Sequence, residues 1–367
     1  MQIDFANLKI QHNLYKEEIE EAILKVARDC NFIMGSQIDE LERNLEKFTG
    51  SKYAISCSSG TDALLLAMMA LDIQPDDEII TTPFTFFATA ETIAFLKAKP
   101  VFVDIDEKTY NIDPKKIEEK ITPKTKAIIP VSLYGQPADM DEINQIAKKY
   151  NLKVIVDGAQ SFGSTYKGIS DSNLGDISCT SFFPAKPLGC YGDGGALFTN
   201  DEKLADKIKS LRLHGQSIRY HHQYIGMGGR LDTIQAAVLN VKLKYYEKDL
   251  KLRQDVASKY TKALNAKNIE TPFVKNDRTS AWAQYSIRVQ NRTELQTKLQ
   301  NLGIPTAVHY PMPLHVQECF KYLNLKEGDF PISEKVSKEI MSLPMNPYVS
   351  DEEIEFIVEN LAKELRC

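Results

Sequence analysis

Residues 176–200 read Asp-Ile-Ser-Cys-Thr-Ser-Phe-Phe-Pro-Ala-Lys-Pro-Leu-Gly-Cys-Tyr-Gly-Asp-Gly-Gly-Ala-Leu-Phe-Thr-Asn. The stretch starts and ends with a run typical of β-strands, and Lys186 stands in the irregular part between them. Pro184 and Pro187 fix the backbone on both sides of this lysine and prevent a regular helix. Stiff backbone therefore directs the Lys186 side chain, which favours a functional role.

The residues around Lys186 are apolar. Phe182, Phe183 and Leu188 would partly desolvate its ammonium group and so lower its pKa. A partly neutral amine can attack a carbonyl and form a Schiff base, the chemistry of enzymes that use pyridoxal phosphate (PLP). The alternative is an ordinary solvated lysine in a loop, because most lysines in proteins are exposed. The rest of the sequence distinguishes the two interpretations.

Composition limits the class of protein. The chain has 367 residues, more than one ordinary domain, and 43% of them are hydrophobic, enough for a large core. A net charge of -5 without a long basic block gives no indication of nucleic-acid binding. The six cysteines form no Cys-x-x-Cys pair, which fits a reducing compartment better than a disulfide scaffold or a zinc site. Without a charged leader or an apolar run of membrane-spanning length, we expect a cytoplasmic protein that binds no membrane.

A phosphate-binding turn is predicted near residue 60. Tyr53–Cys57 has the pattern of a short strand, residues 58–62 form a small polar loop, and an alanine- and leucine-rich helix follows over residues 63–71. The start of a helix directs unpaired N–H groups and the positive end of its dipole beyond the sheet, which suits a phosphate. Alternatively, Ser59 and Thr61 serve only as helix caps.

Strand-like and helical segments alternate along much of the chain. This alternation predicts an α/β fold with a largely parallel sheet, helices on both faces, and a ligand beyond the carboxyl ends of the strands. After Tyr53–Cys57, the predicted strands are Glu78–Thr81, Val101–Asp104, Ala127–Val131, Val154–Asp157, Ile177–Phe182 and Ala196–Thr199. After a short extended lead, the other predicted helices of this part are 16–29, 37–48, 88–96, 114–120 and 139–150.

Two residues beyond predicted strands each have two interpretations. Asp157 could cap the next helix, or it could lie against the pyridine nitrogen of PLP and keep that nitrogen protonated. Phe86 could belong to the core, or it could offer a flat apolar surface on which the cofactor ring stacks. With Gly60-Thr61 and Lys186, however, they form a set in the strand-end loops of one sheet. Their order along the chain is the order that PLP folds of this type use.

Five segments carry a resemblance to a known family. They are Ser-Gly-Thr-Asp-Ala-Leu at 59–64, Asp-Gly-Ala-Gln-Ser-Phe-Gly at 157–163, Ser-Phe-Phe-Pro-Ala-Lys-Pro-Leu-Gly at 181–189, Gly-Asp-Gly-Gly-Ala at 192–196 and Gly-Arg-Leu-Asp at 229–232. In order and spacing they resemble the DegT family of PLP-dependent nucleotide-sugar aminotransferases, fold type I. The resemblance implies a large PLP-binding domain with a mainly parallel mixed sheet, predicted over residues 1–250. A smaller C-terminal α+β domain is predicted over residues 251–367.

The same resemblance implies roles for single residues. It implies that Lys186 holds PLP as a Schiff base, that Asp157 lies at the pyridine nitrogen, and that the chain forms a homodimer with shared active sites. The other cofactor contacts that it implies are Gln160 near the ring hydroxyl, Phe86 stacked on the ring, and Gly60, Thr61 and Ser181 on the phosphate.

The segment before Arg230 departs from the family pattern. An asparagine that commonly reaches the partner subunit's cofactor phosphate is missing, because Met227, Gly228 and Gly229 stand there. Arg230 itself could be a surface residue paired with Asp232. It could instead form two parallel hydrogen bonds to a substrate carboxylate, that of glutamate or of a uronic acid.

The C-terminal part contributes further candidates. Apolar spacing predicts one long helix over residues 231–264, or two helices separated by one break, then a strand over 284–289 and a helix over 293–302. By the resemblance, His309 and Tyr310 face the substrate; a histidine satisfied within a strand is the alternative. No carboxylate or cysteine lies at ligand spacing from the remaining candidate histidines, so we assign them to a loop over the site and expect no metal. These histidines are His214, His221 and His222.

The predicted function is transamination. PLP would take an amino group from L-glutamate and deliver it to C3 of a UDP-linked 2-acetamido-3-keto hexose or its uronic acid, a reaction of cell-surface glycan (lipopolysaccharide) biosynthesis. A dTDP-linked 3-keto-6-deoxy sugar is the alternative substrate. A dehydratase of the same fold, with histidine in place of the lysine, and a non-catalytic PLP-fold regulator are the alternative classes. The presence of Lys186 and Asp157 argues against both classes.

Overall fold

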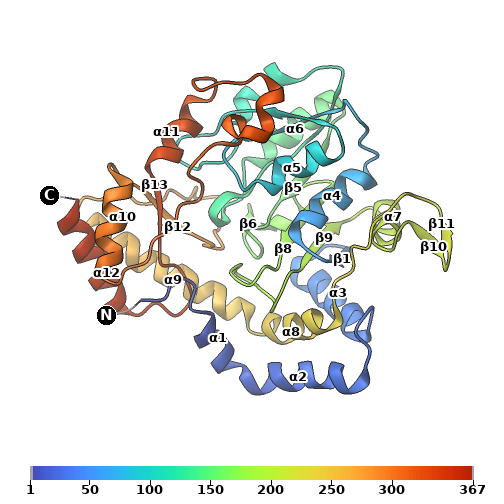
Figure 1. Ribbon diagram of the computed structural model, residues 1–367, viewed down its shortest axis with the longest axis horizontal. Coiled ribbons are helices and arrows are strands. Elements are labelled where there is room, and N and C mark those ends of the chain that lie inside the picture. Colours follow the sequence, from blue (N-terminus) through green and yellow to red (C-terminus); the bar gives the residue numbers. More distant parts are fainter. Residues whose placement is uncertain (1–2, 366–367) are drawn as a thin grey trace.

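A seven-stranded sheet lies at the centre of the structure, a computed structural model that describes residues 3–365 (Figure 1). The strands follow the order β1-β9-β8-β5-β4-β2-β3. All are parallel except β9, which pairs antiparallel with both β1 and β8. The strands are β1 (Tyr53–Cys57), β2 (Glu78–Thr81), β3 (Lys99–Phe102), β4 (Thr125–Ile128), β5 (Lys153–Asp157), β8 (Ile177–Ser181) and β9 (Gly195–Thr199). The predicted α/β class is confirmed. The sheet is mixed because β9 runs antiparallel to both of its neighbours.

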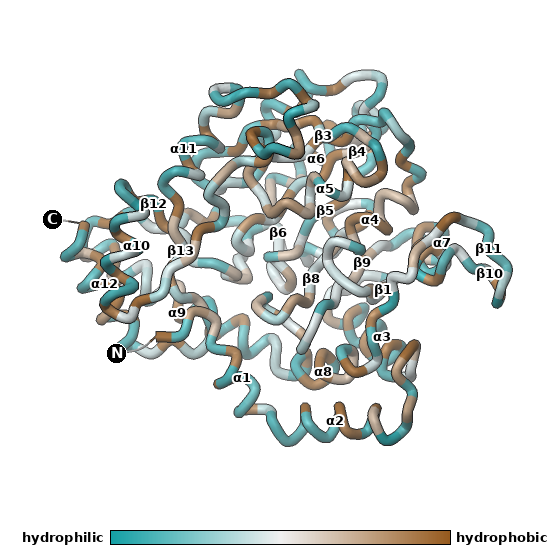
Figure 2. The backbone as a smooth tube through the Cα atoms, in the orientation of Figure 1, coloured by the Kyte–Doolittle hydropathy of each residue, from teal (hydrophilic) through white to brown (hydrophobic). Residues whose placement is uncertain are grey.

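Helices cover both faces of the sheet because successive side chains of a strand point to opposite faces. In β5, Ile155 packs in one apolar cluster, and Val154 and Val156 pack in another. The first face is covered by α4 (Gly60–Ala70), α5 (Ala88–Phe95) and α7 (Glu202–Arg212). The opposite face is covered by α3 (Ser36–Thr49), α6 (Met140–Tyr150) and α8 (Thr233–Leu243). Hydrophilic residues prevail at the periphery, for example along the hairpin of β10 (Gln216–Ile218) and β11 (His221–His222) (Figure 2).

A separate apolar cluster involves the C-terminal elements. It joins α9 (Tyr246–Asn265), α10 (Arg292–Asn301) and α12 (Asp351–Glu364) to an antiparallel pair formed by β12 (Tyr285–Arg288) and β13 (Ile340–Leu343). Ile3, from the other end of the chain, packs in the same cluster. Helix α9 contributes to both regions, because Leu250 packs beside the sheet and Val256 packs in the C-terminal cluster. The domain boundary at residue 250 stays a prediction.

Several predicted boundaries differ from the structure. The helix predicted over 114–120 is wrong: two 3₁₀ turns stand there, each only three residues long. The lead before residue 16 contains a helix, and the long apolar pattern after residue 231 divides into α8 and α9 at Lys244 and Tyr245. The remaining elements are α1 (Leu8–Leu14), α2 (Lys16–Asp29), α11 (Pro331–Glu339), β6 (Thr165–Tyr166), β7 (Ile169–Ser170), β10 (Gln216–Ile218), β11 (His221–His222), η1 (Pro114–Lys116), η2 (Glu118–Lys120), η3 (Leu133–Gly135), η4 (Asp171–Asn173), η5 (Leu314–Val316) and η6 (Glu318–Leu323). Within residues 3–365, no helix is both long and apolar enough to cross a membrane.

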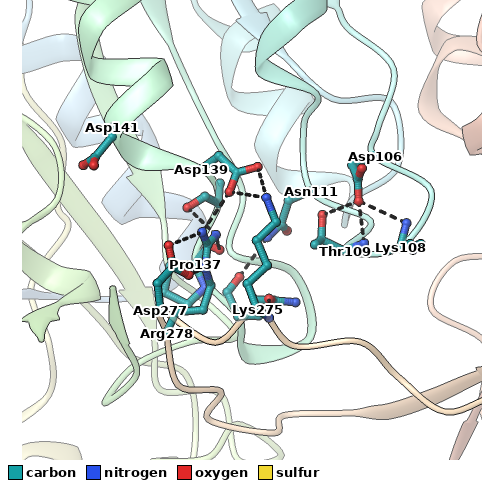
Figure 3. Close-up of polar contacts among 12 residues, drawn as sticks. Asp106, Lys108, Thr109, Asn111, Pro137, Asp139, Asp141, Lys275, Asp277 and Arg278 are labelled. Carbon is teal, nitrogen blue, oxygen red and sulfur yellow. Dashed lines mark hydrogen bonds and ion pairs between the residues drawn. The ribbon is translucent and has the colours of Figure 1, made fainter. Parts of the chain in front are cut away.

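Charges anchor the segment between α9 and β12 to the loops after β4 (Figure 3). The buried Arg278 guanidinium donates to Asp139 at 2.8 Å, to Asp277 at 2.7 Å, and to two backbone carbonyls. Lys275 Nζ lies 2.7 Å from each Asp139 oxygen. Beyond this anchor, Ala283 N–H donates to the carbonyl of Tyr134 at 3.0 Å. The anchored segment therefore supports the loop that contains Tyr134.

Candidate active site

The carboxyl ends of β1, β2, β5 and β8 lie along one edge of the sheet, because these four strands run in the same direction. The seven predicted cofactor-binding residues either end one of these strands or lie in the segment that follows it. These residues are Gly60, Thr61, Phe86, Asp157, Gln160, Ser181 and Lys186. The structure thus gathers at one edge what the sequence distributes over 127 positions (60 to 186, counted inclusively).

The predicted phosphate-binding turn is the start of α4. Ser59 caps this helix, since its hydroxyl accepts from Asp62 N–H at 3.0 Å. Gly60 and Thr61 occupy the first turn, where a helix provides no partner for backbone N–H groups. Gly60 lies against Ser181 so closely that a Cβ on it would be 2.6 Å from Ser181 Cβ. N–H groups at a helix start and a neighbouring hydroxyl together suit a phosphate.

Asp157 ends β5 and is 5% exposed. Its Oδ2 accepts from the Thr89 hydroxyl at 2.7 Å, and its Oδ1 accepts from Ala159 N–H at 3.2 Å. Burial raises the pKa of the Asp157 carboxyl, while these two donors and the positive charge of Lys186 act in the opposite direction. No described α-helix begins at the residues that immediately follow Asp157, so the carboxylate is not a helix N-cap.

Lys186 lies in the irregular loop between β8 and β9, and its N–H donates to Phe183 O at 2.8 Å. Burial lowers the pKa of the Lys186 ammonium, and the negative charge of Asp157 opposes that shift. Phe182 and Leu188 are buried, as the predicted apolar surroundings require. Phe183, however, is 51% exposed, so it contributes less to desolvation than expected.

An aromatic and amide cluster lies beside Asp157. The ring of Phe86 is 53% exposed, and its centroid lies 6.0 Å from that of Tyr310. Gln160 Nε2 donates to the Tyr310 hydroxyl at 3.0 Å, and its Oε1 accepts from Tyr134 N–H at 2.7 Å. The Tyr134 hydroxyl in turn donates to the carbonyl of His309. The anchored Tyr134 loop therefore fixes the Gln160 amide, which connects the large sheet to the C-terminal residue Tyr310.

His309 and Arg230 lie at different parts of the site. His309 Nδ1 and Ser342 Oγ are 2.9 Å apart, and burial together with the charge of Lys186 lowers the pKa of His309 to about 4, so this imidazole is neutral near pH 7. Arg230 follows Gly229, whose carbonyl accepts from Ser58 N–H at 3.1 Å next to the phosphate-binding turn. Within residues 3–365, no ion pair joins Arg230 to Asp232 or to another acid.

His214, His221 and His222 do not form a metal site among the described residues. His222 Nδ1 lies 2.8 Å from the carbonyl oxygen of His214, and His221 and His222 are exposed. His221 and His222 form β11 of the β10–β11 hairpin, which extends from the molecule beside α7 (Figure 1). The expected loop over the site is thus a hairpin directed away from the body of its own chain.

Several residues near the site were not predicted. Thr89 holds Asp157, and Arg253, Gln11 and Tyr348 line a small cavity that also reaches Lys186. No local pattern distinguishes Thr89 from other threonines. The sequence did indicate that Arg253 is unusual, because a charged residue at this position interrupts the apolar face of the predicted helix. In the structure its side chain is buried.

The residues at this edge fit a flat, phosphorylated pyridine. An exposed aromatic face, a buried acid, a desolvated lysine and a helix start that suits a phosphate stand at the neighbouring strand ends. The sequence also matches the DegT/DnrJ/EryC1/StrS aminotransferase family over residues 13–362. The chain belongs to this family. Members of the DegT/DnrJ/EryC1/StrS family are PLP-dependent aminotransferases, and solved relatives contain PLP or its amino form PMP.

Individual relatives are similar along almost their whole length. The UDP-2-acetamido-2-deoxy-3-oxo-D-glucuronate aminotransferase of Pseudomonas aeruginosa is 51% identical over 97% of this chain and 98% of its own. The dTDP-3-amino-3,6-dideoxy-alpha-D-galactopyranose transaminase of Aneurinibacillus thermoaerophilus is 42% identical over 97% of this chain and 98% of its own. A solved DegT DnrJ EryC1 StrS aminotransferase from Brucella abortus superposes with a TM-score of 0.96, at 38% identity, over 99% of this chain and 100% of its own. By their names, the Pseudomonas and Aneurinibacillus relatives are aminotransferases for nucleotide-linked sugars.

Proposed function

We propose that this chain aminates C3 of a UDP-linked 2-acetamido-3-keto hexose or its uronic acid, with L-glutamate as the amino donor. The 51% identity to an aminotransferase of a UDP-linked 3-oxo-glucuronate carries this proposal. The 42% identity to the dTDP-sugar transaminase leaves a dTDP-linked 3-keto-6-deoxy sugar as the second candidate. The retained Lys186 and Asp157 disfavour a purely regulatory role.

Lys186 has two proposed roles. When bound, PLP supplies an aldehyde that accepts the amino group and a ring that delocalises negative charge. The Lys186 amine holds the cofactor, and when free it takes a proton at Nζ from the carbon that carries the substrate nitrogen and returns it on the cofactor side. Burial favours the neutral form that such a base needs.

The other predicted residues hold and orient the cofactor in this proposal. Asp157 would accept a hydrogen bond from the protonated pyridine nitrogen, Phe86 would offer its exposed face to the ring, and Gln160 would donate a hydrogen bond to the ring hydroxyl. The phosphate contacts would come from Gly60, Thr61 and Ser181. The neighbourhood of Gly60 and Ser181, and the exposed face of Phe86, support these assignments.

Arg230, His309 and Tyr310 are the proposed substrate residues. Arg230 has no acidic partner among residues 3–365, so its guanidinium is free to pair with a carboxylate. Glutamate offers such a group, and a uronic acid offers one in the second half-reaction. His309 is neutral and lies near Lys186, where it could accept or donate a hydrogen bond without adding charge.

We further propose a homodimer with shared active sites, in the cytoplasm. The hairpin that ends near His222 extends beyond its own chain and carries the exposed apolar side chains Ile218 (73%) and Tyr220 (76%), which a second copy could cover. All five cysteines of the described part are free, as in a reducing compartment. The proposed product would enter cell-surface glycan synthesis, and the proposed domain division stays at residue 250.

A substrate panel tests the proposal. The purified chain is supplied with PLP, L-glutamate and, in parallel, UDP- and dTDP-linked 3-keto sugars generated in situ. We expect glutamate to remove the visible absorption band of bound PLP, and only a UDP-linked 2-acetamido-3-keto sugar to restore it with formation of a 3-amino product. Turnover of the dTDP sugars alone would contradict the UDP assignment, and failure of glutamate to change the band would contradict the donor.

A further inference from the structure

Asp171 is a buried acid that packs against the turn beginning at Asp157. It begins η4 and is 2% exposed. Its Oδ1 accepts from the Ser132 hydroxyl at 2.9 Å, and its Oδ2 accepts from the Ser161 hydroxyl. The same Oδ2 lies so close to Gly158 that a Cβ on this glycine would be only 2.7 Å away.

These contacts join the two segments that surround Asp157. Ser161 ends the turn that starts at Asp157, and Ser132 N–H donates to the Asp157 carbonyl at 3.0 Å. Two residues after Ser132, the N–H of Tyr134 orients the Gln160 amide. Asp171 therefore contacts both chain segments that place the acid and the amide of the cofactor site.

The charge of Asp171 has no positive partner in the described part of the chain. Its hydrogen-bond partners are uncharged: the hydroxyls of Ser132, Ser161 and Ser178 donate to it, and its own N–H donates to the Ser164 carbonyl. Asp157 is the charged group that acts on its carboxyl, and it is a like charge. Burial raises the pKa of Asp171 to about 6, and Asp157 adds to this rise.

A buried carboxylate without a cation destabilises a fold, so its presence next to a site indicates a function rather than a structural gain. Negative charge near a bound pyridine favours the protonated form of the ring nitrogen. Water cannot screen this charge effectively, because both acids are buried.

We propose that Asp171 is a positioning residue that acts through Asp157: it fixes the Asp157–Ser161 turn from below and supplies a second negative charge that keeps the cofactor ring nitrogen protonated. The inference rests on the proposed placement of Asp157 at that nitrogen. It assigns a role to a residue outside direct contact with cofactor or substrate.

The test uses the full chain loaded with PLP that carries nitrogen-15 in its ring. Solid-state nitrogen-15 NMR reports directly whether the ring nitrogen bears a proton, and it does so without turnover. We expect D171N, which keeps the shape and removes the charge, to lose this proton at a pH about one unit lower than the unmodified chain. The variant should also bind PLP several-fold more weakly.

Three comparison variants make the outcome decisive. D171S, with a smaller side chain and no charge, should shift the titration in the same direction. D176N should leave it unchanged, because Asp176 pairs with Lys153 at the other end of β5. D157N should shift it more than D171N does.

The outcomes separate this inference from the proposed function. An unchanged ring titration in D171N and D171S, together with a shifted one in D157N, would overturn the role of Asp171 alone. An unchanged ring titration in D171N, D171S and D157N alike would overturn the placement of Asp157 as well.

Discussion

Asp139 and Asp171 are both largely shielded from water beside the central sheet, but different groups surround them. Asp139 contacts two cations, Arg278 at 2.8 Å and Lys275 at 2.7 Å (Figure 3). Asp171 contacts two serine hydroxyls and lies near a second acid. The first arrangement balances its charge and anchors a loop. The second leaves its charge unbalanced at the edge where the predicted cofactor residues gather. Charged groups at functional sites commonly differ from structural ion pairs in this way.

Lys186→Ala should have the largest effect, because it removes the cation that acts on Asp157 and the amine that moves the proton. We expect transamination to fall by about 10³-fold or more, roughly 4 kcal/mol of barrier. Steady-state turnover measures the loss, and far-ultraviolet circular dichroism checks that the fold is intact. A folded variant with a tenth of the activity would contradict the assignment.

Asp157→Asn should be next, since an amide cannot hold the ring nitrogen protonated. We expect PLP to remain bound and the half-reaction with glutamate to slow by about 10²-fold, near 3 kcal/mol. Stopped-flow absorbance measures this rate. Thr89→Val is the matched control, because it keeps the acid and removes only the hydrogen bond to it. Equal, small effects of both variants would indicate that Asp157 is structural.

Arg278→Met examines the balanced cluster. It leaves two backbone carbonyls and Asp277 without their buried donor, so the free energy of unfolding should fall by about 3 kcal/mol while kcat changes little. Urea denaturation measures the change. Lys275→Met removes a partner whose side chain is 36% exposed and should cost about 1 kcal/mol or less. The reverse order of the two costs would refute the proposed anchor.

Asp171→Asn should stabilise the chain in a pH-dependent way. Folding raises the pKa of the Asp171 carboxyl from 3.8 to about 6, so the ionised carboxylate destabilises the folded chain. This destabilisation grows as the pH increases from about 4 to 6, and it reaches its full value above pH 6. The full shift corresponds to about 3 kcal/mol, and relaxation around the charge should leave about 2 kcal/mol. When both proteins are measured without PLP, the Tm of the variant should equal that of the unmodified chain near pH 4 and exceed it at pH 8. A lower Tm at pH 8 would show that the carboxylate is a stabilising contact.

Arg230→Lys should have the smallest effect. Lysine keeps the charge and loses the planar pair of donors, so the KM for glutamate should rise about tenfold, roughly 1.4 kcal/mol, while PLP binding stays unchanged. Steady-state kinetics at several glutamate concentrations measure it. If glutamate kinetics do not change, His309 and Tyr310 become the first places to look for the donor carboxylate.

Local pattern predicts the parts of the fold that depend on neighbouring residues. Strands such as Tyr53–Cys57 and Glu78–Thr81 match their predicted limits, and the loops after them bring the predicted cofactor residues to one edge. Contacts between distant segments leave no such pattern. Asp171 meets Ser132 across 39 positions, and Thr89 meets Asp157 across 68, so neither contact could be derived from the sequence.

The direction of β9 shows the same limit. The glycine-rich stretch before Gly195 allows the following strand to run either parallel or antiparallel to its neighbours. Only the pairing of β9 with β1 and β8 determines its direction. The helix expected over residues 114–120 failed for another reason. Its apolar spacing was short, and turns of three residues with i to i+3 bonds satisfy the same pattern.

The single antiparallel strand also determines when the site can form during synthesis. Among residues 3–365, β1 has only β9 as a neighbour in the sheet, so residues 53–57 cannot all be paired before residue 199 has left the ribosome. At about 5–20 residues per second, this delay is on the order of 10 s. Until then the start of α4, which follows β1, is not held against Ser181. The nascent chain therefore completes its predicted phosphate-binding turn late, after the lysine that would hold the cofactor has already been made.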